Sequence, residues 1–233
     1  MSGETVALAY REARERLVAW GRTLDPEEAA ATPVPALPGW SVKDTFSHLV
    51  GLVADVQSGT LSGVPDDETT AAQVSARADA DLPAVLDEWE SRAAAFDELL
   101  VELGSRAPRT LAIDIWAHEV DMRSALGEPV PNGGGAERIL DAAVRRGVGG
   151  GWADRGVPAL RIVTEDEEWV AGGDHPAGSL TTTLFELGRV MLGRRSRSQM
   201  ANLDWDAPDP APWIAALPAF GPAESEVVDS PRA

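Results

Sequence analysis

The feature that most constrains this chain is the helical spacing of apolar residues across its first half. Apolar side chains recur with a period near 3.6 over residues 5–22, and residues 81–103 carry a longer stripe of the same kind. Two further segments, 41–57 and 108–127, also read as helices. Four helices with connections that allow antiparallel neighbours predict a four-helix bundle over residues 1–127.

The second and fourth helices have recognisable ends. Ser41 is suited to the N-cap position, and Asp44 three residues later approximates a capping box. Pro108 stands near the first turn of the fourth helix, and Gly127 follows its last turn. Residues 60–80 are polar, and we expect a long loop there with room for one short turn of helix.

A segment rich in glycine and proline, "GEPVPNGGG", follows the bundle. We take residues 128–135 as a linker. Residues 136–147 then read as a helix, and the alternation in "PALRIVTED" is typical of a strand, with "EEWVAGG" as its hairpin partner. Residues 180–193 look helical again.

The chain is therefore expected to have an α+β fold in two parts. The N-terminal bundle is followed by a smaller α+β domain over residues 136–220. The last residues, 221–233, are acidic and contain proline, and we expect them to be disordered.

Composition excludes several kinds of function. The chain has no cysteine, so disulfides, cysteine-based metal sites and a cysteine nucleophile are ruled out, and thiol chemistry would need an external thiol. A net charge of −18 argues against nucleic-acid binding. No apolar run approaches the length of a membrane span, and the N-terminus lacks an apolar signal segment. We expect a cytoplasmic protein without a membrane or nucleic-acid partner, either monomeric or homodimeric.

Two of the three histidines, His48 and His118, lie inside predicted helices. Asp114 is four residues before His118, so the two side chains share one face of the fourth helix. An unpaired buried carboxylate is costly. Asp114 and His118 are therefore either a satisfied core pair or part of a binding site. His48 lies off the main apolar stripe of its helix, where it can face a neighbouring helix or a cleft.

If His48, Asp114 and His118 converge, they form a site with three protein ligands and one open position. This is the ligand number of catalytic zinc sites, in which the metal lowers the pKa of the water or thiol that it binds. The alternative, judged from the residues alone, is that His48 and His118 are ordinary core residues and bind no metal.

The segments "PGWSVKDTFSHLVGL" and "DIWAHEVDMRSALGEP" resemble two motifs of the DinB-like, mycothiol-dependent maleylpyruvate isomerase family. The first motif supplies one metal histidine, which falls on His48. The second supplies a carboxylate and a second histidine, which fall on Asp114 and His118. "LFELGRVMLGRRSRSQ" resembles a segment of the family's second domain. The family's usual glutamate ligand is replaced here by the shorter Asp114.

The resemblance implies a thiol-dependent metalloenzyme that binds a divalent metal, with Zn²⁺ expected, and uses mycothiol, the low-molecular-weight thiol of actinobacteria, as cosubstrate. The thiol attacks a small electrophile and yields either S-transfer or cis–trans isomerisation. Two alternatives stay open. One is a hydrolase that uses metal-activated water on a thiol conjugate. The other is a non-catalytic binding protein for a small ligand, with a vestigial metal site.

Other polar and aromatic residues allow two interpretations each. Arg194 and Arg195 could bind an anionic part of the substrate or thiol, and are the predicted catalytic residues, or they form a solvated basic stretch. Asp121 either orients His118 or pairs with a neighbouring arginine. Trp40 is expected to be a hydrophobic staple, and His175 to be a turn residue.

Overall fold

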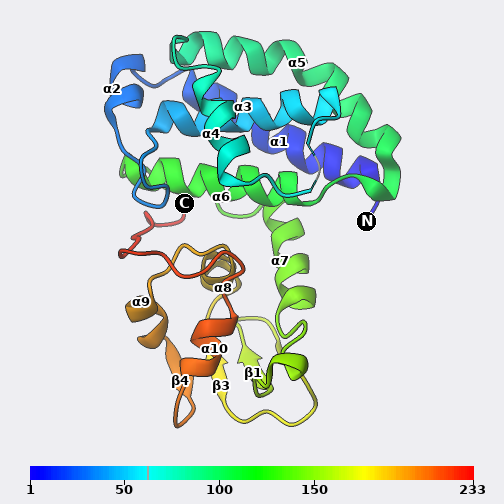
Figure 1. The fold of residues 1–233 in the computed structure, drawn as a ribbon, viewed down its shortest axis with the longest axis vertical. Coiled ribbons are helices and arrows are strands. Elements are labelled where there is room, and N and C mark those ends of the chain that lie inside the picture. The colour runs from blue at the N-terminus through cyan, green and yellow to red at the C-terminus, as the bar shows by residue number, and fades with distance from the viewer. Residues whose placement is uncertain (62) are drawn as a thin grey trace. The chain divides into compact units, whose positions relative to one another are not determined.

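The computed structural model describes residues 1–61 and 63–233 and divides the chain into two compact units (Figure 1). Unit 1 comprises Met1–Ile139 together with Asp229–Ala233, and unit 2 comprises Leu140–Val228. Unit 1 is helical, whereas unit 2 combines helices with a four-stranded sheet. The predicted α+β fold class is confirmed. Among the residues described, no helix is long and apolar enough to cross a membrane.

Unit 1 is built around four long helices: α1 (Gly3–Gly21), α3 (Val42–Ser58), α5 (Leu82–Leu103) and α6 (Thr110–Ala125). Helices α1 and α3 each pack against both α5 and α6, and Figure 1 shows them lying between those two helices. This arrangement is a four-helix bundle. The shorter elements of the unit are α2 (Pro26–Ala31), α4 (Asp67–Ser75) and the 3₁₀ turn η1 (Gly104–Arg106).

The apolar stripes of these helices form the core of unit 1. The rings of Tyr10 and Phe96 lie 5.1 Å apart in an edge-to-face arrangement, and Phe46 meets Trp89 at 6.4 Å. Aliphatic side chains fill the remaining space: Leu17, Leu49, Leu82, Leu86, Leu100 and Ile115. Each buried side chain of this size contributes about 1.5–3 kcal/mol. The stripes therefore decide which helix faces meet.

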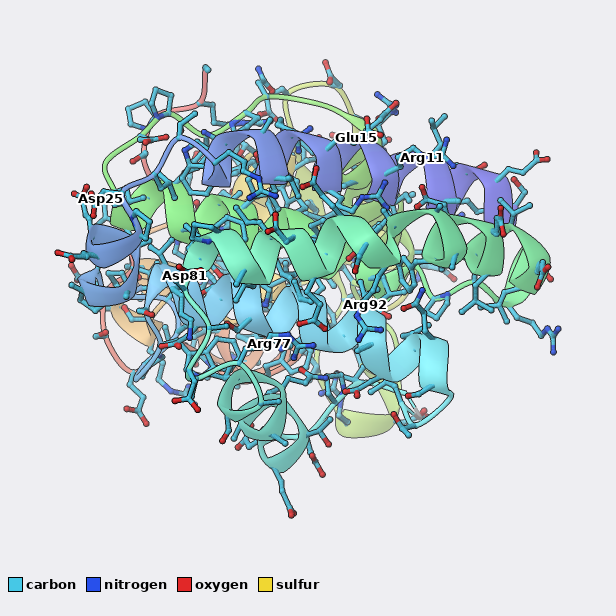
Figure 2. All side chains as sticks on the ribbon, turned by 90° about the horizontal axis from the view of Figure 1, so that it is seen from above. Arg11, Glu15, Asp25, Arg77, Asp81 and Arg92 are labelled. Atoms are coloured by element: carbon cyan, nitrogen blue, oxygen red, sulfur yellow. The ribbon has the colours of Figure 1, made fainter. Side chains whose placement is uncertain are left out.

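Ion pairs to two buried carboxylates fix α1 against its two neighbours. Asp97 of α5 accepts from Arg14 Nη1 at 2.8 Å and from Arg11 Nε at 2.7 Å. Glu119 of α6, which is 2% exposed, accepts from Arg16 Nε at 2.9 Å. Figure 2 shows Arg11 at the boundary between α1 and α5. Removal of one partner from such a pair leaves an uncompensated buried charge, so these contacts restrict how α1 can shift.

The start of α3 matches the capping box expected from the sequence. The Asp44 backbone N–H donates to Ser41 Oγ at 3.1 Å, and the Ser41 N–H donates to Asp44 Oδ2 at 3.0 Å. The helix ends at Ser58 and is followed by the C-cap Gly59, whose φ of 72° is a left-handed conformation that favours glycine. These two ends set the positions of the polar residues along α3.

Helix α4 is longer than the short turn expected between residues 60 and 80. Asp66 caps it, since its Oδ1 accepts from the Thr69 N–H at 2.9 Å. The inner face of α4 carries Gln73, which is 4% exposed, in place of an apolar stripe. The helix therefore left no hydrophobic periodicity in the sequence. It packs closely on α3, where a Cβ added to Gly51 would lie 2.4 Å from the Cβ of Gln73.

Unit 2 contains a four-stranded sheet in the order β2-β1-β3-β4. The strands are β1 (Leu160–Val163), β2 (Glu168–Ala171), β3 (Ser179–Thr181) and β4 (Asp204–Asp206). Strands β1 and β2 form the predicted antiparallel hairpin, whereas β1 and β3 are parallel and β3 and β4 antiparallel. One side of the sheet is apolar and buried, with Leu160, Ile162 and Leu180 at its centre.

The helices of this part of the chain are α7 (Gly135–Gly147), η2 (Ala153–Arg155), α8 (Leu184–Met191), α9 (Arg197–Ala201) and α10 (Ala211–Ala216). The helix expected over residues 180–193 begins later than predicted, because residues 179–181 pair in the sheet as β3. Thr183 then caps α8 by accepting from the Glu186 N–H at 2.9 Å.

The division between the two units falls after Ile139, inside α7. The domain boundaries expected from the sequence, with a linker over residues 128–135, stay a prediction. The last residues were expected to be disordered, but the Val130 N–H donates to the Pro231 carbonyl at 2.9 Å, and the Ala233 N–H donates back to Val130 at 2.8 Å. The partner of this backbone lies about a hundred residues earlier, so local composition could not reveal it.

Replacement of Gly51 by alanine tests the close packing of α4 on α3. Alanine gains about 1 kcal/mol of helix propensity, but overpacking against Gln73 costs about 1–3 kcal/mol. We expect Gly51→Ala to lower the free energy of unfolding, measured by urea denaturation, by about 1 kcal/mol. Gly147→Ala is the control, because its nearest neighbour is Met191 Cε at an ordinary 3.6 Å. Equal stability of Gly51→Ala and the unmodified protein would contradict the packing described.

Candidate metal centre

His48 from α3 and Asp114 and His118 from α6 come together where these helices pack. His48 Nε2 lies 3.6 Å from Asp114 Oδ2, and His118 Nε2 lies 3.4 Å from Asp114 Oδ1. One ligand atom from each residue lies within 4.8 Å of the others. Among the residues described, this is the cluster of histidine and carboxylate groups that could hold a metal ion.

The local sequence explains where each of these residues stands on its own helix. His48 follows the N-cap Ser41 by seven residues, which places it on the second turn of α3. Asp114 and His118 are one turn apart on α6, so both point from the same face. The two imidazole rings are nearly perpendicular, with centroids 5.1 Å apart. The face of α6 that carries Asp114 and His118 packs against α3.

The three residues fit a divalent metal. Tetrahedral zinc, with ligands at about 2.0–2.1 Å, places its ligand atoms about 3.3 Å apart. Each imidazole lies 3.4–3.6 Å from a different oxygen of Asp114, and one ligand atom from each of the three residues lies within 4.8 Å of the others. Asp114 Oδ2 is buried and has no hydrogen-bond partner among the residues described. A buried carboxylate oxygen without a partner is costly, and a cation would satisfy it. The shorter aspartate thus still reaches both imidazoles.

The charges of the three residues are strongly coupled. Burial acts to raise the pKa of Asp114, but the His118 and His48 imidazoles outweigh it and hold that pKa far below its ordinary value. Burial acts to lower the pKa of His118, whereas Asp114 and then Asp121 raise it, to about 9. At neutral pH His118 therefore carries a proton in the metal-free protein, and a metal cation must displace it.

Asp121 lies on the far side of the His118 ring. Its Oδ2 is 3.4 Å from His118 Nδ1, and its side chain is fully buried. The sequence left open whether Asp121 orients His118 or pairs with Arg123. The 3.4 Å contact of Asp121 with His118 Nδ1 favours the orienting role.

The corresponding partner of His48 is Gln73, which the sequence did not predict. Gln73 Oε1 lies 2.7 Å from His48 Nδ1, and both side chains are buried. A single glutamine in a polar segment carries no recognisable pattern. Only the packing of α4 on α3 reveals this contact.

A model of the mycothiol maleylpyruvate isomerase N-terminal domain matches residues 10–123. This span contains His48, Asp114 and His118 and most of the bundle. The N-terminal unit of this chain belongs to that domain family. The resemblance stated from the two histidine-bearing motifs is thereby confirmed.

Solved structures of the family share the fold. The crystal structure of the mycothiol-dependent maleylpyruvate isomerase matches with a TM-score of 0.53 and 17% sequence identity, over 82% of this chain and 88% of that chain. A mutant of this isomerase with one histidine replaced by alanine matches with a TM-score of 0.52 and 16% identity, over the same shares. No curated protein sequence matches this chain.

In this isomerase-family domain, Trp40 lies beside the candidate metal centre. Its half-buried indole is 5.0 Å from the His48 ring and 6.4 Å from the His118 ring, measured between centroids. The hydrophobic staple that the sequence predicted at the start of α3 stays a prediction. The structure places the indole of Trp40 next to two of the three candidate ligands.

The two arginines predicted to be catalytic lie in unit 2, between α8 and α9. Arg195 is buried and donates from Nε and Nη2 to the two carboxylate oxygens of Glu186, at 2.6 and 2.7 Å. Arg194 Nη1 donates to the Leu192 carbonyl at 2.7 Å. The ion pair favours a structural role for Arg195, and a catalytic role for either arginine stays a prediction. His175 lies exposed in the loop between β2 and β3.

Zinc content tests the convergence of the two buried histidines. Protein equilibrated with zinc and then desalted should carry about one ion per chain by mass spectrometry, the stoichiometry of a single three-ligand site. His48→Ala and His118→Ala should each lose it, because two remaining ligands bind weakly. His175→Ala removes an exposed imidazole and should keep the metal. Retention of zinc by both buried-site variants would show that these histidines are core residues.

Proton release tests the coupling between His118 and the metal. The pKa of His118 is raised to about 9, so at pH 7 its proton must leave when zinc binds. Below pH 9 the apparent zinc affinity should therefore increase with pH, by about tenfold per unit for one displaced proton. Calorimetry in buffers of different ionisation enthalpy measures the proton count directly. A count of zero at pH 7 would contradict a His118 that is protonated before zinc binds.

Proposed function

We propose that this protein is a metal-dependent enzyme that uses a low-molecular-weight thiol, with mycothiol as the expected cosubstrate and Zn²⁺ as the expected metal. The observation that carries this proposal is the meeting of His48, Asp114 and His118, in which one buried carboxylate oxygen has no hydrogen-bond partner among the described residues. We also propose that the activity is cytoplasmic, in keeping with the expectation from the sequence.

The residues of the site have separate roles in this proposal. His48, Asp114 and His118 hold the metal, which, when bound, acts as a Lewis acid that favours the thiolate form of the cosubstrate. Asp114 supplies a negative charge that balances the metal. Trp40 covers one side of the imidazoles and limits the access of water, which keeps the local dielectric low.

The nucleophile is proposed to come from outside the chain. The sequence contains no cysteine, so no side chain of this protein can supply a thiolate. A solved structure of similar fold is that of the mycothiol-dependent maleylpyruvate isomerase, and the N-terminal unit matches the model of that enzyme's N-terminal domain. Both findings support a thiol cosubstrate.

Two reactions of a thiolate with a small electrophile fit this site. In S-transfer, sulfur forms a bond to carbon and displaces a leaving group. In isomerisation, sulfur adds to one alkene carbon while the π electrons move into a conjugated carbonyl. The former double bond then rotates as a single bond, and the return of the electrons expels the thiolate unchanged. We propose one of these two outcomes, with Arg194 and Arg195 as candidates for contacts to an anionic group of the substrate.

The proposal is tested by turnover of maleylpyruvate, followed by its absorbance, with zinc-loaded protein and mycothiol. Product should form only when both the metal and the thiol are present. His48→Ala should lower the rate by about 100-fold or more, since loss of a metal centre removes several kcal/mol of stabilisation. A panel of other conjugated and alkylating electrophiles covers S-transfer, and His175→Ala is the matched control.

The other outcomes of this experiment point to different functions. Hydrolysis of a thiol conjugate without added thiol would identify a hydrolase that uses metal-activated water. Binding of a small ligand that survives in His48→Ala, with no turnover under any condition, would identify a binding protein with a vestigial metal site. Either result would overturn the thiol-dependent reaction.

A further inference from the structure

His48 is held on the side opposite to the candidate metal centre by a chain of two side chains. Gln73 Oε1 lies 2.7 Å from His48 Nδ1, and Gln73 Nε2 lies 2.6 Å from Asp55 Oδ2. His48 and Gln73 are 3% and 4% exposed, so water does not compete for their hydrogen bond. Asp55 is half-buried and lies at the outer end of the chain.

The chemistry of Asp55 sets the direction of both hydrogen bonds. A carboxylate accepts hydrogen bonds and donates none, so Gln73 must present its NH₂ group to Asp55. Its carbonyl oxygen then faces His48, and this oxygen can only accept. The proton of the neutral imidazole is therefore required on Nδ1, which leaves a lone pair on Nε2, the atom that faces Asp114.

Asp114 by itself would favour the opposite tautomer. Its Oδ2 lies 3.6 Å from His48 Nε2 and would attract a proton to that nitrogen. The hydrogen bond to Gln73 is 0.9 Å shorter than this contact (3.6 Å against 2.7 Å) and is the better formed of the two. We propose that Asp55 and Gln73 are positioning residues that keep His48 in the tautomer able to ligate a metal through Nε2. We call the hydrogen-bonded series Asp55–Gln73–His48 the relay. Its role rests on the proposed function, because that role requires His48 to bind a metal.

Helix α4 is anchored in a way that keeps Gln73 in place. Gly51 allows α4 to approach α3 closely, since a Cβ at Gly51 would lie 2.6 Å from Gln73 Cγ. Arg77 Nη1 donates to the Gln73 carbonyl at 2.9 Å, and Arg77 Nε also donates to Glu88 of α5 at 2.8 Å. Figure 2 shows Arg77 on the side of unit 1 where α3 lies. The buried Lys43 extends the anchor by donating to the Arg77 carbonyl at 2.6 Å.

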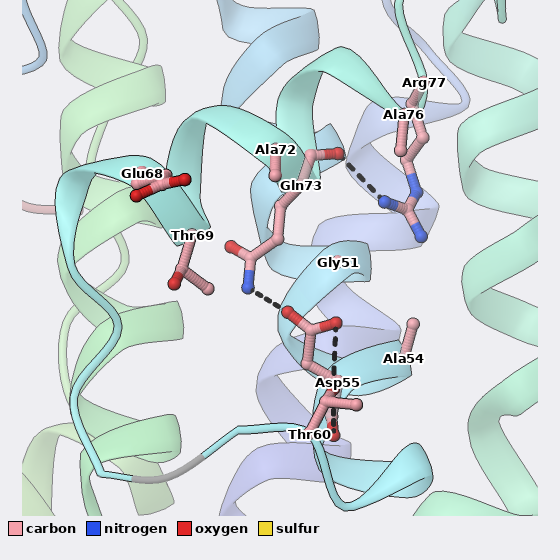
Figure 3. A pocket seen from close by; sticks show the side chains of 10 residues that line it. All are labelled: Gly51, Ala54, Asp55, Thr60, Glu68, Thr69, Ala72, Gln73, Ala76 and Arg77. Atoms are coloured by element: carbon pink, nitrogen blue, oxygen red, sulfur yellow. Dashed lines mark hydrogen bonds between the residues drawn. The ribbon is translucent and has the colours of Figure 1, made fainter.

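The outer end of the relay borders a cavity of about 520 Å³ between α3 and α4. Figure 3 shows Gln73 donating to Asp55 at this cavity, with Thr60 beside Asp55 and Glu68 on the opposite wall. Thr60 Oγ1 donates to Asp55 Oδ1 at a long 3.5 Å. Because the cavity is open, Asp55 can be changed without a void in the core. Glu68 offers a matched control, since it is an exposed carboxylate of the same cavity that does not contact Gln73.

The variants are Asp55→Asn, Gln73→Leu and the control Glu68→Gln. Asparagine keeps the shape of Asp55 but can donate as well as accept, so Gln73 can flip and lose its directional effect. Leucine removes the acceptor from His48 at similar volume. Glu68→Gln removes the same charge from the same cavity. Circular dichroism of each variant checks that the helices are intact.

The first readout is zinc affinity, measured by competition with a chromophoric chelator. Gln73→Leu should weaken zinc binding by about 10–100-fold and Asp55→Asn by about tenfold, the range found for groups that orient a metal-ligating histidine. Glu68→Gln should bind zinc as the unmodified protein does. Equal zinc affinity in all three variants would overturn the inference.

The second readout is the tautomer of His48 in the metal-free protein, from long-range ¹H–¹⁵N spectra recorded where the rings are neutral. With three histidines in the chain, His48 is assigned by comparison with His48→Ala. The unmodified protein and Glu68→Gln should show the proton on Nδ1, whereas Gln73→Leu and Asp55→Asn should shift it toward Nε2. An unchanged tautomer in both variants would refute the relay. If the unmodified protein binds no zinc, the proposed function fails, and this spectrum still decides whether the relay exists.

Discussion

The structure of unit 1 depends on how a small group of polar side chains is buried between two helices. Asp114 lies between two imidazoles, and all three residues project into a region where α3 packs on α6. A partly buried carboxylate in an apolar bundle is stable only if neighbouring groups compensate its charge. For Asp114 the main compensation comes from His118, which lowers the pKa of Asp114, while the charge of Asp114 raises the pKa of His118. The packing of α3 against α6 therefore brings these charged groups together.

The surrounding helices hold these positions by different means. Arg14 and Arg16 of α1 form ion pairs with Asp97 of α5 and Glu119 of α6, so α1 links the two outer helices of the bundle. The capping box at Ser41 sets where α3 begins, and thus which turn carries His48. Helix α4 adds a polar anchor through Gln73. Capping, ion pairing and core packing thus all act on the helices that carry or contact the site.

Much of the fold could be predicted from local patterns. The four long helices, the capping box at Ser41 and the hairpin of β1 and β2 all follow from periodicity and helix-end signals. Helix α4 was underestimated because its buried face is polar at Gln73. Strand β3 was taken as the start of a helix because its three residues are stabilised by pairing with β1 and β4, which are distant in sequence. The pairing of Val130 with Pro231 and Ala233 escaped prediction for the same reason.

The sequence by itself determined the residue types of the candidate site and the family of the N-terminal unit, because His48, Asp114 and His118 lie in short motifs whose helical spacing can be counted. The tertiary structure alone decided that the three side chains meet, that Asp114 Oδ2 has no hydrogen-bond partner among the described residues, and that Gln73 and Asp55 lie behind His48. Spacing along one helix specifies a face, but contacts between helices depend on the packing of the whole core. Partners such as Gln73, which come from a segment without a pattern, become visible only when that packing is known.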